Sequence, residues 1–190
     1  YARDFESTGE SYGGLRIRNY SKAGRFVSAD LNQEFDFKTN FRISGFFTIE
    51  HDNALDPSGF DIALCDKWGE KLSIVLGDGR MNAFSIKMIG EKYGAQPVTA
   101  RSENIRIWPT THEGPVYNHF LIQIWQHGGE TRCSLYVNRD TPDFSQSSFV
   151  HERIVDPRMF SGAIRHIKFK LWKAGILKLY NFEVAELRGG

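Results

Sequence analysis

The chain has 190 residues, of which 41% are hydrophobic and 14% aromatic, and its formal net charge at pH 7 is +1. A charge this close to zero lacks the basic excess of nucleic-acid-binding domains, so we expect no nucleic-acid partner. No run of about 18 or more apolar residues occurs, so we also expect no membrane insertion.

Apolar and polar residues alternate along much of the chain, which is the pattern of a half-buried β-strand. The alternation predicts strands at 15–17, 41–49, 60–64, 72–76 and 84–88. Gly77-Asp78-Gly79 offers the positive φ angles that a tight hairpin needs between the last two of these strands. The stretch 90–118 is polar, is interrupted by Gly and Pro, and holds one short strand candidate at 104–108.

The alternation resumes at 120–125 and 133–137, with a turn at Gly128 and Gly129 between them. A second polar loop is expected up to about residue 160. Two last strands follow at 164–171 and 176–184, and we expect them to meet across 173–175. Many short strands separated by turns, without a helical period, predict an all-β sandwich or barrel.

Nothing divides the chain into two parts, because no internal repeat or change of composition occurs. We expect one domain over 1–190. The chain begins at Tyr1 rather than Met, so we interpret this domain as excised or processed from a larger protein. The end, Leu187-Arg188-Gly189-Gly190, resembles Leu-x-Gly-Gly protease sites, and a flexible boundary is the alternative.

The two cysteines, Cys65 and Cys133, both fall in predicted strands. Two cysteines do not make a disulfide framework. We interpret them as reduced core thiols, because free cysteine packs as a small hydrophobic residue, and a Cys65–Cys133 disulfide stays open as the alternative.

A family resemblance rests on three stretches of the chain. The letters NHFLIQIW at 118–125 and CSLYVN at 133–138 resemble the hairpin of concanavalin A-like and laminin-G-like domains, and GILKLYNFEV at 175–184 is similar to their last strand. The resemblance implies a two-sheet antiparallel jelly-roll sandwich that holds ligands on its concave face or at rim loops. We interpret the chain as a ligand-binding domain of this kind, from an extracellular or cell-surface protein.

The strand register separates two faces. Ile167, Phe169 and Leu171 must enter the core, which leaves Lys168 and Lys170 on the other face. Aromatic rings stack on the apolar faces of sugars, while Lys and Arg attract carboxylate or sulfate groups. If the strands are neighbours, one exposed face carries both the aromatic rings and the basic side chains. Trp125 and Tyr180 would be its stacking platforms. The predicted glycan-binding face is Trp125, Arg132, Tyr136, Lys168, Lys170, Trp172, Lys178 and Tyr180.

The simpler alternative is an ordinary solvated face, because strand lysines also discourage edge-to-edge aggregation.

A separate hypothesis concerns a metal site. Asp52, Asn53, Asp56 and Asp61 gather the oxygen ligands that Ca²⁺ prefers. Asp and Asn in turns also cap their own backbone without metal, so this site stays open, and no other cofactor is expected.

Catalytic motifs are incomplete. No Glu-x-Asp-x-Glu strand of a glycosidase occurs. The segments 101–106 (RSENIR), 123–125 (QIW) and 171–177 (LWKAGIL) follow the order of three alginate-lyase motifs. However, Trp125 stands where that family has His, and Leu171 and Leu177 stand where it has Tyr, so the groups that move protons are missing. We therefore predict a non-catalytic, lectin-like carbohydrate-binding module, possible partners being acidic glycans. The alternatives are a protein–protein adhesive module and a polysaccharide lyase acting on uronate polymers.

Overall fold

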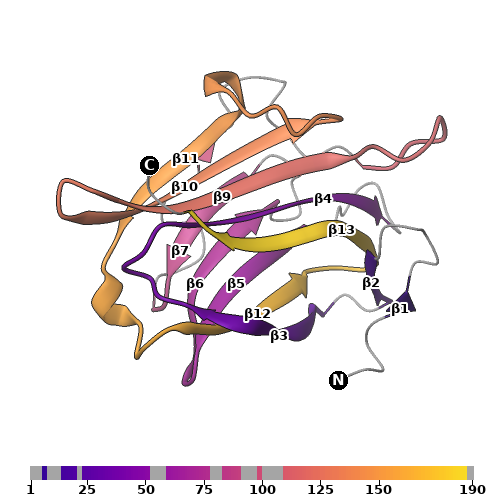
Figure 1. The fold of residues 1–190 in the computed structure, drawn as a ribbon. Helices are drawn as coiled ribbons and strands as arrows, with labels where there is room; N and C mark the ends of the chain where they lie inside the picture. The colour runs from indigo at the N-terminus through magenta and orange to yellow at the C-terminus, as the bar shows by residue number, and fades with distance from the viewer. Residues whose placement is uncertain are drawn as a thin grey trace.

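The computed structural model describes residues 6–7, 14–20, 23–51, 59–77, 83–90, 98–99 and 109–187. These residues form two antiparallel sheets packed face to face, with no α-helix among them (Figure 1). Two short 3-10 helices, η2 (Gln146–Ser148) and η3 (Pro157–Met159), flank one strand. The predicted two-sheet antiparallel jelly-roll is confirmed.

Each sheet combines strands from the beginning, the middle and the end of the chain. The seven-stranded sheet has the order β1 (Glu6–Ser7), β2 (Gly14–Asn19), β13 (Gly175–Glu186), β4 (Phe41–His51), β9 (Asn118–His127), β10 (Glu130–Arg139) and β11 (Phe149–Val155). The six-stranded sheet has the order β3 (Arg25–Phe35), β12 (Ile164–Leu171), β5 (Phe60–Asp66), β6 (Gly69–Leu76), β7 (Ala83–Met88) and β8 (Val98–Thr99).

Aromatic side chains fill the space between the sheets. The ring of Phe47 in β4 lies 4.6 Å from that of Phe60 in β5 and 6.2 Å from that of Phe120 in β9, measured between centroids. All three rings are fully buried. Each contributes about 1.5–3 kcal/mol by leaving water, so rings from both sheets hold the sandwich together.

The predicted turn between β9 and β10 is confirmed. Gly128 and Gly129 have φ of 59° and 81°, and the strands pair from Glu130 with His127 to Arg139 with Asn118. Two consecutive positive φ angles match the twist of a two-residue hairpin, which glycine adopts without strain. The turn therefore fixes the register of both strands.

Strand β11 was missed, because 149–155 was assigned to a loop. The segment lacks clean alternation: Arg153 lies inside it and donates from Nη1 to the Ile86 carbonyl of β7 at 2.9 Å. That bond joins β11, at the edge of the seven-stranded sheet, to β7 of the other sheet. The strand candidate at 104–108 and the end at 188–190 lie outside the described residues.

The last two strands do not form the expected hairpin. β12 pairs with β3 and β5, whereas β13 pairs with β2 and β4 in the other sheet. The short link between them crosses from sheet to sheet, and Trp172 donates its backbone N–H to the Gly59 carbonyl at 3.0 Å. Alternation shows which way a side chain points but not which strand lies alongside, so the sequence pattern fits either arrangement.

Both cysteines are free, buried thiols. Cys133 belongs to the hydrophobic core between the sheets, and Cys65 lies outside that cluster. Burial raises the pKa of Cys65 to about 11 and also raises the pKa of Cys133. Both thiols are therefore protonated at neutral pH. In the part of the chain that is described, no helix is long and apolar enough to cross a membrane.

Candidate functional site

The eight residues predicted to share one face lie on two sheets. Five of them are in the seven-stranded sheet: Trp125, Arg132, Tyr136, Lys178 and Tyr180. The other three belong to β12 or follow it directly, on the six-stranded sheet: Lys168, Lys170 and Trp172. The core separates the two outer faces, so the prediction of a single face is wrong. Its error was to treat β12 and β13 as neighbours.

Tyr180 is not an exposed platform. Its side chain faces outward from β13, but only 4% of the residue is exposed. The ring of Phe46 stacks on it at 5.1 Å with an interplanar angle of 13°, and Tyr117 packs against its edge at 6.1 Å. Tyr180 therefore packs beneath Phe46 and Tyr117 and is covered by them.

Trp125 and Arg132 belong to a polar network that also includes Ser134, Glu130 and Glu152. The Trp125 indole N–H donates to Ser134 Oγ at 2.9 Å, and the Arg132 guanidinium lies 5.9 Å from the indole ring. Arg132 also pairs with Glu152 at 2.6 Å and with Glu130 at 2.9 Å. The hydrogen bonds that Arg132 donates to Glu152 and Glu130 raise the pKa of its guanidinium. The charge of Arg132 is therefore matched by its neighbours.

A groove of about 380 Å³ lies on the outer face of the seven-stranded sheet. We call it the sheet groove. It crosses β4, β9 and β13, and one wall comes from the segment after β10. Its lining is Arg42, Ser44, Gly45, Phe46, His119, Phe120, Leu121, Pro142, Phe144, Asn181 and Glu183. None of these residues was predicted, although Phe46 stood on the polar side of the 41–49 alternation and was a signal for it.

Aromatic rings gather at one end of the sheet groove. The Phe46 centroid lies 4.9 Å from that of His119, 5.1 Å from that of Tyr180 and 5.6 Å from that of Tyr117. Burial lowers the pKa of His119, although the nearby Asp140 carboxylate opposes this shift. The imidazole is therefore neutral at pH 7 and adds a flat, uncharged surface to the cluster.

Polar groups form the other part of the groove. Arg42 Nη2 and Glu183 Oε2 lie 3.3 Å apart, and both side chains are well exposed. Beside them, Asn181 has φ of 46°, and the pairing of β13 with β4 shifts between Tyr180 and Glu183. This is a β-bulge, a feature that often re-aims side chains next to binding sites. Asn is one of the few residues other than Gly that adopts this conformation readily.

The bulge also sets the face of Phe182. Uninterrupted alternation along β13 would place Phe182 on the same face as Lys178 and Tyr180, but its ring lies 5.1 Å from Phe169 and packs against the core. One extra residue at the bulge reverses the alternation after Tyr180.

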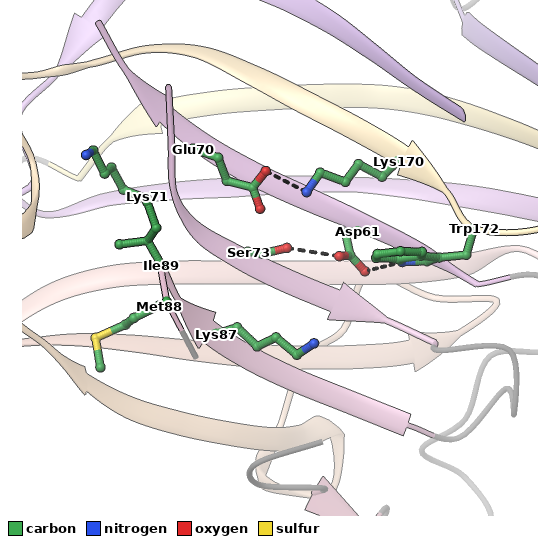
Figure 2. A pocket seen from close by; sticks show the side chains of 10 residues that line it. Asp61, Glu70, Lys71, Ser73, Lys87, Met88, Ile89, Lys170 and Trp172 are labelled. Atoms are coloured by element: carbon green, nitrogen blue, oxygen red, sulfur yellow. Dashed lines mark hydrogen bonds and ion pairs between the residues drawn. The ribbon is translucent and has the colours of Figure 1, made fainter. Parts of the chain in front are cut away.

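A second cavity, of about 340 Å³, lies on the outer face of the six-stranded sheet. We call it the Asp61 cavity. Asp61 accepts hydrogen bonds from Trp172 Nε1 at 2.8 Å and from Ser73 Oγ at 3.0 Å, and Lys170 pairs with Glu70 at 2.5 Å (Figure 2). Burial raises the pKa of Asp61 to about 6, against the hydrogen bonds and nearby lysines that favour its ionised form.

Comparisons with known proteins address the fold. No protein-family model and no curated protein matches the sequence. Among solved structures, arcelin-5, a lectin-like defence protein from Phaseolus vulgaris, matches with a TM-score of 0.61 at 9% identity, over 98% of this chain and 91% of that chain. Lectin II from Ulex europaeus matches with 0.58 at 11% identity, over 91% and 86%. An alginate lyase from Pseudomonas aeruginosa matches with 0.56 at 11% identity, over 98% and 89%.

The chain has a concanavalin A-like jelly-roll fold. The likeness to alginate lyases, first suggested by sequence motifs, is also present in the structures. The laminin-G-like part of the expectation stays a prediction.

The lyase motifs have a different environment in this concanavalin A-like sandwich. Gln123 and Trp125 point outward from β9, but Leu171 and Leu177 are completely buried in the core. A leucine side chain cannot donate or accept a proton, so these two positions cannot take the role of the tyrosines in the lyase motifs. The segment 101–106 lies outside the described residues.

The Ca²⁺ hypothesis stays a prediction. Asp52, Asn53 and Asp56 lie outside the described residues. Asp61 is described, and each of its carboxylate oxygens accepts a hydrogen bond from a neighbouring side chain. Within the described ranges, no group of three or more His, Cys, Asp or Glu side chains is arranged to hold a metal ion.

Proposed function

We propose that this chain is a carbohydrate-recognition module that holds a glycan in the sheet groove. The observation that supports it most is an aromatic surface beside an exposed polar rim, in one groove of about 380 Å³. This volume lies in the range of small-ligand sites. A sugar ring presents both an apolar C–H face and a rim of hydroxyl groups, so it matches both parts of the groove.

The side chains assign roles within the groove. Phe46 and Phe144 offer rings against which a sugar face can pack. Arg42 donates hydrogen bonds, Glu183 accepts them, and the Asn181 amide does both. Because Arg42 and Glu183 neutralise each other, the groove suits hydroxyl groups better than strongly charged ones. A neutral sugar residue is the ligand that we expect here.

The structural comparisons give independent support for the ligand class. The matched structures carry the names of a lectin-like protein, a lectin and an alginate lyase, and each name refers to carbohydrate. At 9–11% identity they suggest the class and leave the sugar open. The adhesive-module alternative predicts a protein partner instead, and a glycan array would separate the two.

We expect Phe46→Ala to weaken binding of an array-selected glycan by about 1–3 kcal/mol, by analogy with aromatic stacking on nucleobases. Asn181→Gly should weaken it by about 1 kcal/mol, because glycine keeps the positive φ but lacks the amide. Isothermal titration calorimetry measures both effects. Phe26→Ala is the matched control, since Phe26 is 59% exposed and belongs to β3 of the other sheet.

Phe46 also packs on Tyr180, so each variant's folding is checked by its thermal unfolding curve. Full affinity in folded Phe46→Ala and Asn181→Gly proteins would contradict a site in the sheet groove. An array without any bound glycan would contradict carbohydrate recognition itself.

A further inference from the structure

We propose that the Asp61 cavity is a second binding site, on the opposite side of the sandwich from the sheet groove, for an anionic ligand that carries hydroxyl groups and has the size of one sugar residue. A uronic acid residue has this chemistry. The proposal concerns other strands and other residues than the sheet groove, so either site can exist without the other.

The centre of the cavity is a buried carboxylate. Asp61 lies in the middle of the six-stranded sheet, opposite Lys170 of β12 and Val75 of β6, and is only 2% exposed. Its two hydrogen-bond donors, the Trp172 indole and the Ser73 hydroxyl, are both neutral. Burying a carboxylate with such partners is costly for the fold. A costly ionisable group beside a cavity is typical of binding sites rather than of structural positions.

The surrounding charge selects the ligand. Lys71, Lys87 and Lys170 line the cavity against two carboxylates, Asp61 and Glu70, which leaves an excess of positive charge. Glu70 is engaged with Lys170 at 2.5 Å. An anionic group is therefore favoured near the lysines, and charge-assisted hydrogen bonds from lysine to a carboxylate are stronger than neutral ones.

The remaining walls are apolar. Met88 and the 61% exposed Ile89 lie on one side, and the ring of Trp172 lies on the other (Figure 2). An exposed apolar wall, carboxylate oxygens that can accept further hydrogen bonds and surplus lysines together match a ring that bears both hydroxyls and an acid group. The volume of about 340 Å³ is at the small end of ligand sites and suits one such ring.

Protonation of Asp61 should adjust the affinity. Charged groups line the same cavity from three strands: Glu70 and Lys71 from β6, Lys87 from β7 and Lys170 from β12. The charges of Lys170 and Lys87 act directly on Asp61. Since the pKa of Asp61 is about 6, mild acid removes one negative charge from the cavity while a sugar carboxylate stays ionised. Binding of the anion should therefore strengthen as the pH falls through about 6.

The test is an NMR titration of the ¹⁵N-labelled chain with D-galacturonate, D-galactose and inorganic sulfate as probes. We expect galacturonate to shift amide signals of β5, β6, β7 and β12, and to bind more tightly at about pH 5 than at about pH 7.5. Lys87→Gln should weaken it at least about fivefold. Lys178→Gln is the matched control, because Lys178 lies on the seven-stranded sheet and should have no effect.

Asp61→Asn should remove the pH dependence of binding. Equal affinity for galactose and galacturonate would overturn the anionic ligand, and sulfate binding as tightly as galacturonate would overturn the need for hydroxyl groups. Shifts confined to β4, β9 and β13 would overturn this location. Phe46→Ala should leave these signals unchanged, so failure of this site and failure of the sheet groove give different results.

Discussion

Gly45→Ala should lower the free energy of unfolding by about 1–3 kcal/mol, and Gly45→Val should lower it further. Gly45 lies in β4 directly over the core. A Cβ atom there would lie 3.0 Å from the Tyr180 carbonyl oxygen and 3.2 Å from a ring carbon of Phe120. Both neighbours are held firmly, the first as backbone and the second as a fully buried ring. The strands must therefore move apart to admit a methyl group.

Urea unfolding followed by tryptophan fluorescence measures this loss. Gly24→Ala is the matched control, because a Cβ at Gly24 meets its nearest atom, the Leu171 carbonyl oxygen, at an ordinary 3.4 Å. Its stability should change by about 0.5 kcal/mol or less. The double variant Phe120→Leu with Gly45→Ala should lower the free energy of unfolding by less than the sum of the two single variants. The smaller leucine side chain leaves room for the new methyl group. Equal stability of the two alanine variants would contradict the crowding at Gly45.

Asp61 should make the protein less stable as the pH rises from about 4 to about 7. The pKa of Asp61 is about 6 in the folded chain against an ordinary aspartate value of 3.8, so the folded state holds its proton more tightly than the unfolded state. The stabilisation is full below the unfolded pKa and is lost as the pH rises through the folded pKa. The difference corresponds to about 3 kcal/mol for this single group.

Urea unfolding at several pH values tests this linkage by comparing the wild type with Asp61→Asn, which should lack this decline. Asp66, in the same strand, is the contrast. Burial pushes its pKa upward, but backbone N–H groups of Ser161 and Trp68 outweigh it, so the pKa is lowered. Ionised Asp66 should therefore stabilise the folded state above the pKa that Asp66 has in the unfolded chain. This stabilisation should be lost in acid. Parallel stability curves for wild type and Asp61→Asn would contradict the raised pKa.

Much of the core could be predicted from the sequence, because a strand's side chains alternate with a period of two. The inward positions Ile167, Phe169 and Leu171 in β12 were assigned correctly and are buried. The outward direction of Trp125 followed from the same rule. These assignments needed only neighbouring residues, and the cost of burying lysine kept them in one register.

The sites depended on contacts between distant parts of the chain. The sheet groove joins Phe46, His119 and Asn181, which come from three strands far apart in sequence. The Asp61 cavity similarly brings Asp61 next to Trp172. Alternation carries no information about which strands pair, so Asp61 was grouped with a sequence-local metal loop and Trp172 with the wrong sheet.

The bulge at Asn181 makes chain length at this point as important as residue identity. Tyr180 pairs with Phe46 and Glu183 with Ser44, so β13 carries one residue more than β4 between these two pairs. Deleting Asn181 would remove that extra residue and leave Phe182 facing the core and Glu183 facing solvent. Inserting one more residue would instead exchange the faces of every side chain that follows in β13. In related chains, we expect this point to accept the loss of one residue more readily than a gain.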